Sequence, residues 1–188
     1  MISNEQLKEI VPAISPNNLI IYTSLLNSLT NKYEINTKQR LCAFIAQVAH
    51  ESGSFRYVRE LASGQAYEGR KDLGNVNPGD GVKFKGRGLI QITGRNNYKA
   101  CSLYLYNDER LLDNPFILEE PINAAGSACW YWNSRNLNNI CDQDDNWIHN
   151  WNGKVYSKFE WITVKINGGL NGYEDRMNFY LKAKEILT

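Results

Sequence analysis

The sequence predicts a mainly α-helical protein with a small β or loop region, and three observations support this. Apolar residues recur at positions 41, 44, 45 and 48, a spacing that indicates a helix with one face toward the core. Residues 119 to 133 combine alanines and a tryptophan at helical spacing and predict a buried helix. Residues 63 to 88 hold seven glycines and one proline, which favours a long loop or a weak hairpin.

Three helices are expected before the glycine-rich segment. Residues 7 to 11 indicate a short helix that Pro12 stops, and a second helix opens near residues 17 and 18. Asn36 is the expected N-cap of the third, because Gln39 three residues later can complete a capping box.

More helix is expected after the glycine-rich segment. Residues 98 to 106 and 173 to 187 have helical apolar spacing, and residues 159 to 166 form an apolar run. The polar, tryptophan-bearing residues 134 to 157 are expected to be loop. The chain has 188 residues, 43% apolar and 22% charged, so one compact domain of ordinary globular composition is expected.

Composition also bounds the partners and the location. The net charge of +1 argues against an electrostatic nucleic-acid binder. The four cysteines include no CxxC pair, which favours free thiols made in a reducing compartment. Early charged residues and the lack of a long apolar run argue against a signal peptide and a membrane span. We therefore expect synthesis in the cytoplasm and delivery to any external substrate by another route.

The stretch AHESGSFRYVRE, residues 49 to 60, places two carboxylates, Glu51 and Glu60, near the end of the third helix. A zinc protease motif would need a second histidine at the position of Ser54, so zinc binding is excluded. The segment from Gly86 to Gly88 lacks the third glycine of a dinucleotide loop. No metal or cofactor is expected.

The two acids suit a division of labour. Glu51 follows an apolar stripe, where partial desolvation would raise its pKa and favour proton donation. Glu60 lies beyond Gly53 near the open loop, where it can stay ionised as a base. Glycosidic cleavage needs such a pair. The structural alternative is that Glu51 only caps its helix or pairs with Arg56 or Arg59.

Amides and aromatic rings in the same chain suit a polysaccharide, because amides bind hydroxyl and N-acetyl groups and rings stack on sugar faces. The amide and hydroxyl candidates are Gln91, Thr93, Asn96, Asn97, Tyr98 and Asn167. The run Trp130, Tyr131 and Trp132 is instead assigned to the core, because it lies on a helix with alanines.

Four motifs occur in one order: AHESG (49 to 53), FKGRGLIQITGRNNY (84 to 98), INGGLNG (166 to 172) and DRMNFY (175 to 180). Over roughly residues 40 to 185 the chain closely resembles glycoside hydrolase family 19, the chitinases and related endolysins that cut bacterial peptidoglycan. The resemblance implies a lysozyme-like, two-lobed α-helical fold with the cleft between the lobes. Residues 1 to 188 would then form a single catalytic domain, with N-terminal helices over residues 1 to 35.

The resemblance also implies residue roles. Glu51 would be the general acid, and Glu60 the general base that activates water in an inverting mechanism. Substrate contacts would come from Gln91, Asn97 and Tyr98, with Thr93 helping to hold the water. Asn167 would meet the N-acetyl group, and Arg176 would organise charge near the base.

Three departures from the family pattern matter. Glu68 is a competing candidate for the base, because the loop between the two acids varies in length. The cysteines do not match the disulfides of the plant enzymes. Residues 138 to 160 are longer than the usual link, with Trp147 and Trp151 as sugar or partner contacts.

These points favour a monomeric hydrolase of bacterial cell-wall peptidoglycan, released through a holin or exported by a secretion machine. A chitinase acting on chitin oligomers and a non-catalytic glycan-binding member are the two alternatives. An effector held by an immunity or inhibitor protein is a further reading, which rests on the Trp-bearing segment alone.

Overall fold

The computed structural model describes residues 1–187 and confirms a mainly α-helical fold. The N-terminal part forms α1 (Asn4–Ile10), α2 (Pro16–Lys32) and α3 (Lys38–Glu51). Thr37 caps α3, since its side chain accepts a hydrogen bond from the Arg40 amide at 3.3 Å. The predicted cap at Asn36 is therefore wrong by one position, because the threonine hydroxyl satisfies the free helix amide instead.

The glycine-rich segment is neither an open loop nor a hairpin. It folds into the short 3-10 turns η1 (Gln65–Tyr67) and η2 (Lys71–Leu73) and the one-turn helix α4 (Asp80–Lys83). Isolated bridges pair Arg59 with Arg87 and Arg87 with Ile92. The expected small β patch therefore does not form here, because repeated turns leave no residues free for a longer ladder.

The rest of the chain adds the remaining helices and one hairpin. The helices are α5 (Arg95–Tyr106), α6 (Arg110–Asp113), η3 (Pro115–Glu119), α7 (Pro121–Ser134), α8 (Leu137–Cys141), α9 (Lys158–Asn167) and α10 (Tyr173–Ile186). The antiparallel hairpin joins β1 (Ile148–Trp151) to β2 (Lys154–Ser157). It occupies part of residues 134 to 157, where loop was expected, because the turn at Asn152 and Gly153 takes positive φ angles that allow a tight reversal.

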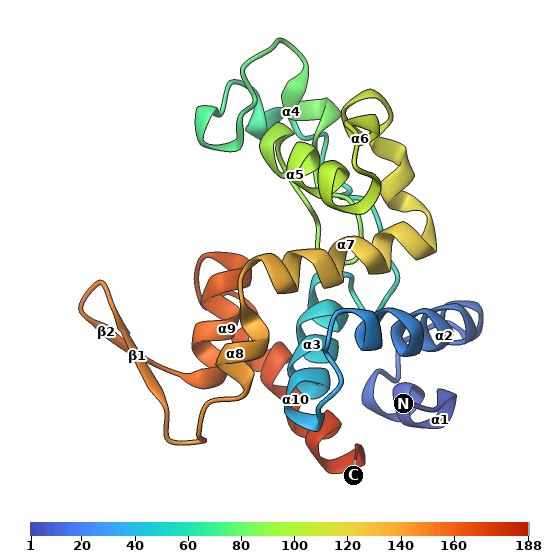
Figure 1. Ribbon diagram of the computed structural model, residues 1–188, viewed down its shortest axis with the longest axis vertical. Helices are drawn as coiled ribbons and strands as arrows, with labels where there is room; N and C mark the ends of the chain where they lie inside the picture. Colours follow the sequence, from blue (N-terminus) through green and yellow to red (C-terminus); the bar gives the residue numbers. More distant parts are fainter. Residues whose placement is uncertain (188) are drawn as a thin grey trace.

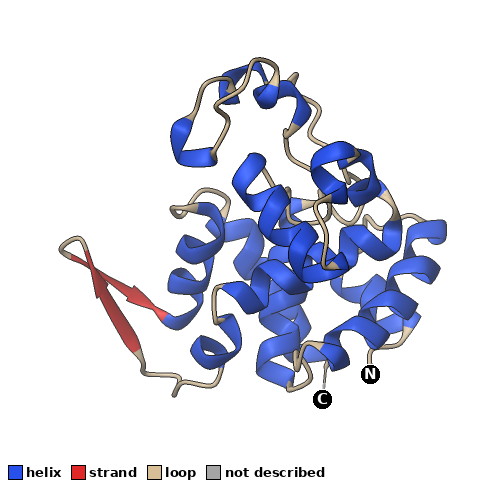
Figure 2. Cartoon of the chain, turned by 45° about the horizontal axis from the view of Figure 1, so that its top comes forward, coloured by secondary structure: helices blue, strands red, loops and turns tan. Residues whose placement is uncertain are grey.

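The molecule has two lobes, with α7 running between them (Figure 1). α1 to α3 and α8 to α10 form one lobe, and the glycine-rich turns with α4 to α6 form the other (Figures 1 and 2). α3 packs along α10, and its Phe44 meets Trp132 of α7 edge to face at 5.4 Å. One cluster of buried apolar side chains includes members from both lobes. The two lobes therefore share one hydrophobic core.

All four cysteines are buried and free, which confirms the expected thiols. Burial raises the pKa of Cys42 to about 11 and that of Cys101 to about 12. Within residues 1–187, no helix combines the length and apolarity needed to cross a membrane. The same residues form no group of three or more His, Cys, Asp or Glu side chains able to hold a metal ion.

Candidate active site

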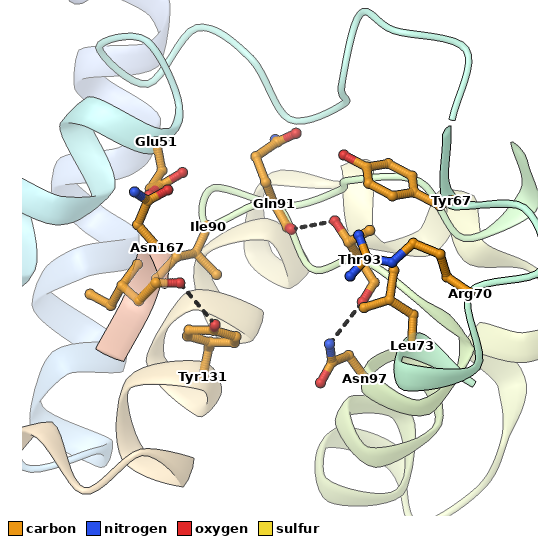
Figure 3. Close-up of a pocket in the computed structure, with 11 residues that line it drawn as sticks. Glu51, Tyr67, Arg70, Leu73, Ile90, Gln91, Thr93, Asn97, Tyr131 and Asn167 are labelled. Carbon is orange, nitrogen blue, oxygen red and sulfur yellow. Dashed lines mark hydrogen bonds between the residues drawn. The ribbon is translucent and has the colours of Figure 1, made fainter. Parts of the chain in front are cut away.

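A cavity of about 370 Å³ receives side chains from both lobes (Figure 3). Its lining residues are Glu51, Tyr67, Arg70, Leu73, Ile90, Gln91, Thr93, Asn97, Tyr131, Ile166 and Asn167. Glu51 ends α3 and Asn167 ends α9, so helix ends form one wall. Residues 67 to 97 form the facing wall. Five predicted site residues thus meet in one cleft, whereas Glu60, Tyr98 and Arg176 are not on its lining.

Glu51 is held from behind by a buried polar network. Its side chain is 18% exposed, and its Oε1 accepts a hydrogen bond from Arg176 Nη2 at 2.5 Å. Arg176 Nη1 also donates to Gln47 Oε1 at 2.6 Å, and Gln47 Nε2 donates to Thr163 Oγ1 at 2.9 Å. The network ties α10, α3 and α9 together and fixes one carboxylate oxygen of Glu51.

Arg176 was expected to organise charge near the base, and the structure places it in contact with Glu51 instead. The guanidinium is 1% exposed and contacts Glu51, the predicted acid. The reason is the packing of α10 along α3, which directs Arg176 at the end of α3. Arg176 therefore fixes the position of the Glu51 carboxylate.

The loop after Asn167 is pinned to the same helix end. His50 Nδ1 lies 2.6 Å from Asp175 Oδ2 at the start of α10. Gly172 has φ +71°, and a Cβ there would lie 2.2 Å from the His50 ring. Only glycine fits this close approach without a shift, so His50 sets the path of the loop that leaves Asn167 at the cleft.

Glu60 lies next to the cleft rather than on its lining. It is partly buried, and its carboxylate accepts hydrogen bonds from the Tyr67 hydroxyl and the Gly86 amide, both at 3.0 Å. A Cβ at Gly86 would lie 2.7 Å from Gln91 Oε1 and 3.3 Å from Glu60 Cβ. Glycine at this point therefore lets Glu60 approach the cleft residues Tyr67 and Gln91.

Tyr67 and Glu60 form a coupled pair at the cleft edge. Burial raises the pKa of Tyr67, and its hydrogen bond to Glu60 raises that pKa further. The tyrosine therefore stays protonated and can donate to the carboxylate.

Glu68, the competing base, has a structural task. Its two carboxylate oxygens accept hydrogen bonds from the amides of Gly79 and Gly81 at 2.6 and 2.8 Å. A Cβ at Gly81 would lie 2.5 Å from the Glu68 amide. Both oxygens of Glu68 thus bind backbone amides at the start of α4, whereas Glu60 binds Tyr67 of the cleft lining.

Hydrogen bonds link Gln91, Thr93 and Asn97 along the wall that faces Glu51 and Asn167 (Figure 3). Thr93 Oγ1 donates to the Gln91 carbonyl at 2.9 Å, and Asn97 Nδ2 donates to the Thr93 carbonyl at 2.8 Å. Gln91 adopts a positive φ of 56°, an uncommon conformation for a residue with a side chain. The strained turn presents these polar side chains to the cavity together.

Tyr98 was expected to contact substrate, and this is wrong. The residue is fully buried, and its hydroxyl donates to the Lys85 carbonyl at 2.7 Å and accepts from Arg87 Nη1 at 3.0 Å. Because successive helical residues point about 100° apart, Asn97 faces the cleft while Tyr98 faces the core. Tyr98 supports the wall from behind.

Several residues that line the cavity were not predicted from the sequence, chiefly Tyr67, Arg70 and Tyr131. Trp130 and Trp132 are buried as expected, but Tyr131 between them lines the cavity. Its hydroxyl donates to the Ile166 carbonyl at 3.2 Å, next to Asn167. The sequence did contain a signal for this, because adjacent residues of a helix point about 100° apart. Residue 131 therefore faces another direction than the buried residues 130 and 132.

Comparison with known proteins agrees with this geometry. No family model matches the chain. A glycosyl hydrolase family 19 domain-containing protein of Haemophilus influenzae is 30% identical over 181 residues, covering 76% of this chain and 78% of that protein. An endochitinase of Arabidopsis thaliana is 34% identical over 151 residues, covering 77% of this chain and 47% of its own length. The chain therefore spans about half the length of that plant relative.

Chitinase C from Streptomyces griseus HUT6037 shares the fold, with a TM-score of 0.69 and 24% identity over 98% of this chain and 76% of that one. The two-lobed helical fold is thus lysozyme-like, and the family of the relatives defines the class as a glycan-cleaving hydrolase. The chain belongs to glycosyl hydrolase family 19.

Proposed function

We propose that this protein hydrolyses bacterial peptidoglycan at β-1,4 bonds between N-acetyl sugars. The observation that carries the choice of substrate is Arg70, a cation on the cleft lining whose side chain is 47% exposed. Peptidoglycan bears carboxylates on its lactyl-peptide substituents, whereas chitin is neutral. An arginine pairs well with a carboxylate, so Arg70 favours the anionic polymer. Its ion pair with the more exposed Asp72 keeps the guanidinium oriented.

The proposed mechanism is a single displacement with inversion. Glu51 protonates the oxygen of the leaving sugar, and Glu60 removes a proton from the water that attacks the opposite face. Inverting enzymes hold the two carboxyl groups about 6.5–9.5 Å apart so that water fits between them. Asn97 and Asn167 line the same cavity and supply amides for hydroxyl and N-acetyl groups.

Chitin is the second candidate substrate, and one observation favours it. Relatives over most of this chain are named endochitinases. The cleft also offers neutral amides that would bind chitin and peptidoglycan sugars alike.

Purified protein incubated with cell-wall sacculi and, separately, with chitin oligomers tests the proposal. We expect release of reducing ends from sacculi, and loss by a factor of roughly 10²–10⁴ in Glu51→Gln, because a general acid contributes about that much. Arg70→Gln should slow cleavage of sacculi roughly tenfold and leave chitin oligomers unaffected. If the protein hydrolyses chitin oligomers and not sacculi, chitin and not peptidoglycan is its substrate. Turbidity that stays constant on permeabilised bacteria, with glycan still bound, would indicate a binding protein.

A further inference from the structure

The hairpin at residues 148–157 carries an aromatic surface that the cleft does not use. It projects away from the body of the protein in both views (Figures 1 and 2). The pairing of His149 with Tyr156 and of Trp151 with Lys154 places these four side chains on one face, because side chains alternate along a strand. Trp161 of α9 lies 4.0 Å from His149, ring centre to ring centre, in a stacked arrangement.

The opposite face has a different chemistry. Ile148, paired with Ser157, and Val155, paired with Asn150, lie there. Ile148 is 57% and Val155 60% exposed, and neither is aromatic. The two faces of one hairpin thus separate the rings from the aliphatic side chains.

Part of the aromatic face is explained by the need to anchor the hairpin. Two four-residue strands alone are only marginally stable in water. Tyr156 is buried, and its ring lies 5.6 Å from Trp161, while His149 stacks on Trp161. These three rings attach the hairpin to α9.

Trp151 and Trp147 extend beyond that anchor. Trp151 is 43% exposed and tilts against Trp161 at 5.6 Å. Trp147 is half-buried, and its ring stacks on that of His149 at 5.7 Å, ring centre to ring centre. Large flat rings therefore remain in contact with solvent, and the hairpin forgoes the free energy that burying them would provide.

The segment that carries these rings is rich in amides, and its charged neighbours are Asp144 and Asp145 before it and Lys158 after it. Asn146, Asn150 and Asn152 are exposed, and Lys154 is the single Lys, Arg, Asp or Glu between residues 146 and 157. Flat rings beside amide donors and acceptors match the uncharged N-acetyl sugar rings that form the backbone of peptidoglycan and of chitin alike. A purely aliphatic partner would leave the amides without a complementary group.

We propose that the aromatic face of this hairpin is an auxiliary binding surface for a strand of the same glycan that the cleft cuts. This inference rests on the proposed function. α9 follows directly after β2 and ends at Asn167 in the cleft, so one helix of about 15 Å links the hairpin to the cleft. An insoluble polymer can engage both places, whereas a short oligomer fills the cleft alone. The hairpin would hold the enzyme on the polymer between cuts.

Binding to insoluble polymer tests the surface in a catalytically disabled background. Glu51→Gln protein is mixed with sacculi and with chitin, and the bound fraction is measured after sedimentation. Adding Trp151→Ala should weaken binding roughly threefold to tenfold. Adding Val155→Ala, on the opposite face of the same hairpin, should change nothing. Equal loss in both variants, or in neither, would overturn the proposal.

Two further measurements keep the outcome interpretable. Trp151→Tyr keeps a ring and should retain most of the binding, whereas a hairpin that merely needs a bulky anchor would accept Trp151→Leu equally well. With Glu51 intact, Trp151→Ala should slow cleavage of insoluble polymer and leave soluble oligomers unaffected.

A wild-type protein that cleaves neither polymer would refute the proposed function. Cleavage that is unchanged by Trp151→Ala would refute the hairpin alone. A partner protein that is captured only by wild type, with glycan binding unchanged, would also overturn it.

Discussion

The two walls of the cleft are built by different means. The wall that carries Glu51 consists of α3, α9 and α10, whose apolar faces bury one another. The facing wall, residues 67 to 97 with Glu60 beside it, consists of turns and short helices. We call it the polar wall, because side-chain polar contacts there add to buried residues such as Phe84 and Ile92. There Asp80 binds Arg95, and Asn75 joins the Arg95 amide at 2.9 Å to the Tyr67 carbonyl at 2.9 Å.

This difference separates two tasks. Apolar burial holds the helices that carry Glu51 together, and the contact with Arg176 fixes its carboxylate. Side-chain hydrogen bonds to backbone instead shape the turns of the polar wall. Segments with few buried side chains open more readily, so residues 61 to 73, of which only Gly64 is buried, are expected to be the more mobile part on slow timescales.

The largest expected effect separates Glu60 from its competitor on the polar wall. Glu60→Gln should lower activity by roughly 10²–10⁴, as loss of a general base does. Glu68→Gln can accept with only one oxygen, so it should lose a hydrogen bond and some stability but keep activity per folded molecule. Rates on sacculi, normalised to folded protein, decide between them. An inactive Glu68→Gln with an active Glu60→Gln would move the base to position 68.

The next effect concerns the wall of α3, α9 and α10, the apolar wall, at the buried polar network behind Glu51. Arg176→Ala leaves Gln47 and Glu51 without their buried cationic partner, so unfolding free energy should fall by about 3–5 kcal/mol. Urea unfolding measures this. Lys182→Ala, at an exposed position of the same helix, is the matched control and should stay within about 0.5 kcal/mol. Equal changes in the two variants would show that the network carries no stability.

A smaller effect should appear on the polar wall and depend on pH. Asp80 is 2% exposed, and its carboxylate accepts from Arg95 Nε at 2.8 Å and Nη2 at 2.6 Å. Asp80→Asn should cost roughly 2 kcal/mol at neutral pH. The pair with Arg95 holds the pKa of Asp80 below its ordinary value of 3.8. This stabilisation is therefore complete above pH 3.8 and declines as pH falls through the lowered pKa.

The difference between wild type and Asp80→Asn should accordingly shrink in acid, as measured by urea unfolding at several pH values. Asp72→Asn is the control, since Asp72 is 63% exposed in its pair with Arg70 and such pairs contribute little. A difference that grows in acid would contradict this account.

The sequence predicted the apolar wall far better than the polar one. The spacing of apolar residues predicted α3 and α7, because the buried positions of a helix recur every three to four residues along the chain. The contacts of Glu68 with Gly79 and Gly81 join residues 11 and 13 positions apart and leave no periodic trace. Among the site residues, Glu51 and the chain from Gln91 to Asn97 were placed in the cleft by motif. Tyr98 and Tyr131 were assigned to the wrong side, because adjacent helical positions differ by about 100°.

The buried cysteines have a kinetic consequence. Thiolates, not thiols, react with oxidants and alkylating reagents, and burial raises the pKa of Cys129 and Cys141 to about 12. Each thiol must first be exposed by opening of the fold before it can react. Labelling by an excess of thiol reagent should therefore proceed at the rate of opening and not rise with reagent concentration. In oxidising surroundings the lifetime of the protein would then be set by how often it opens.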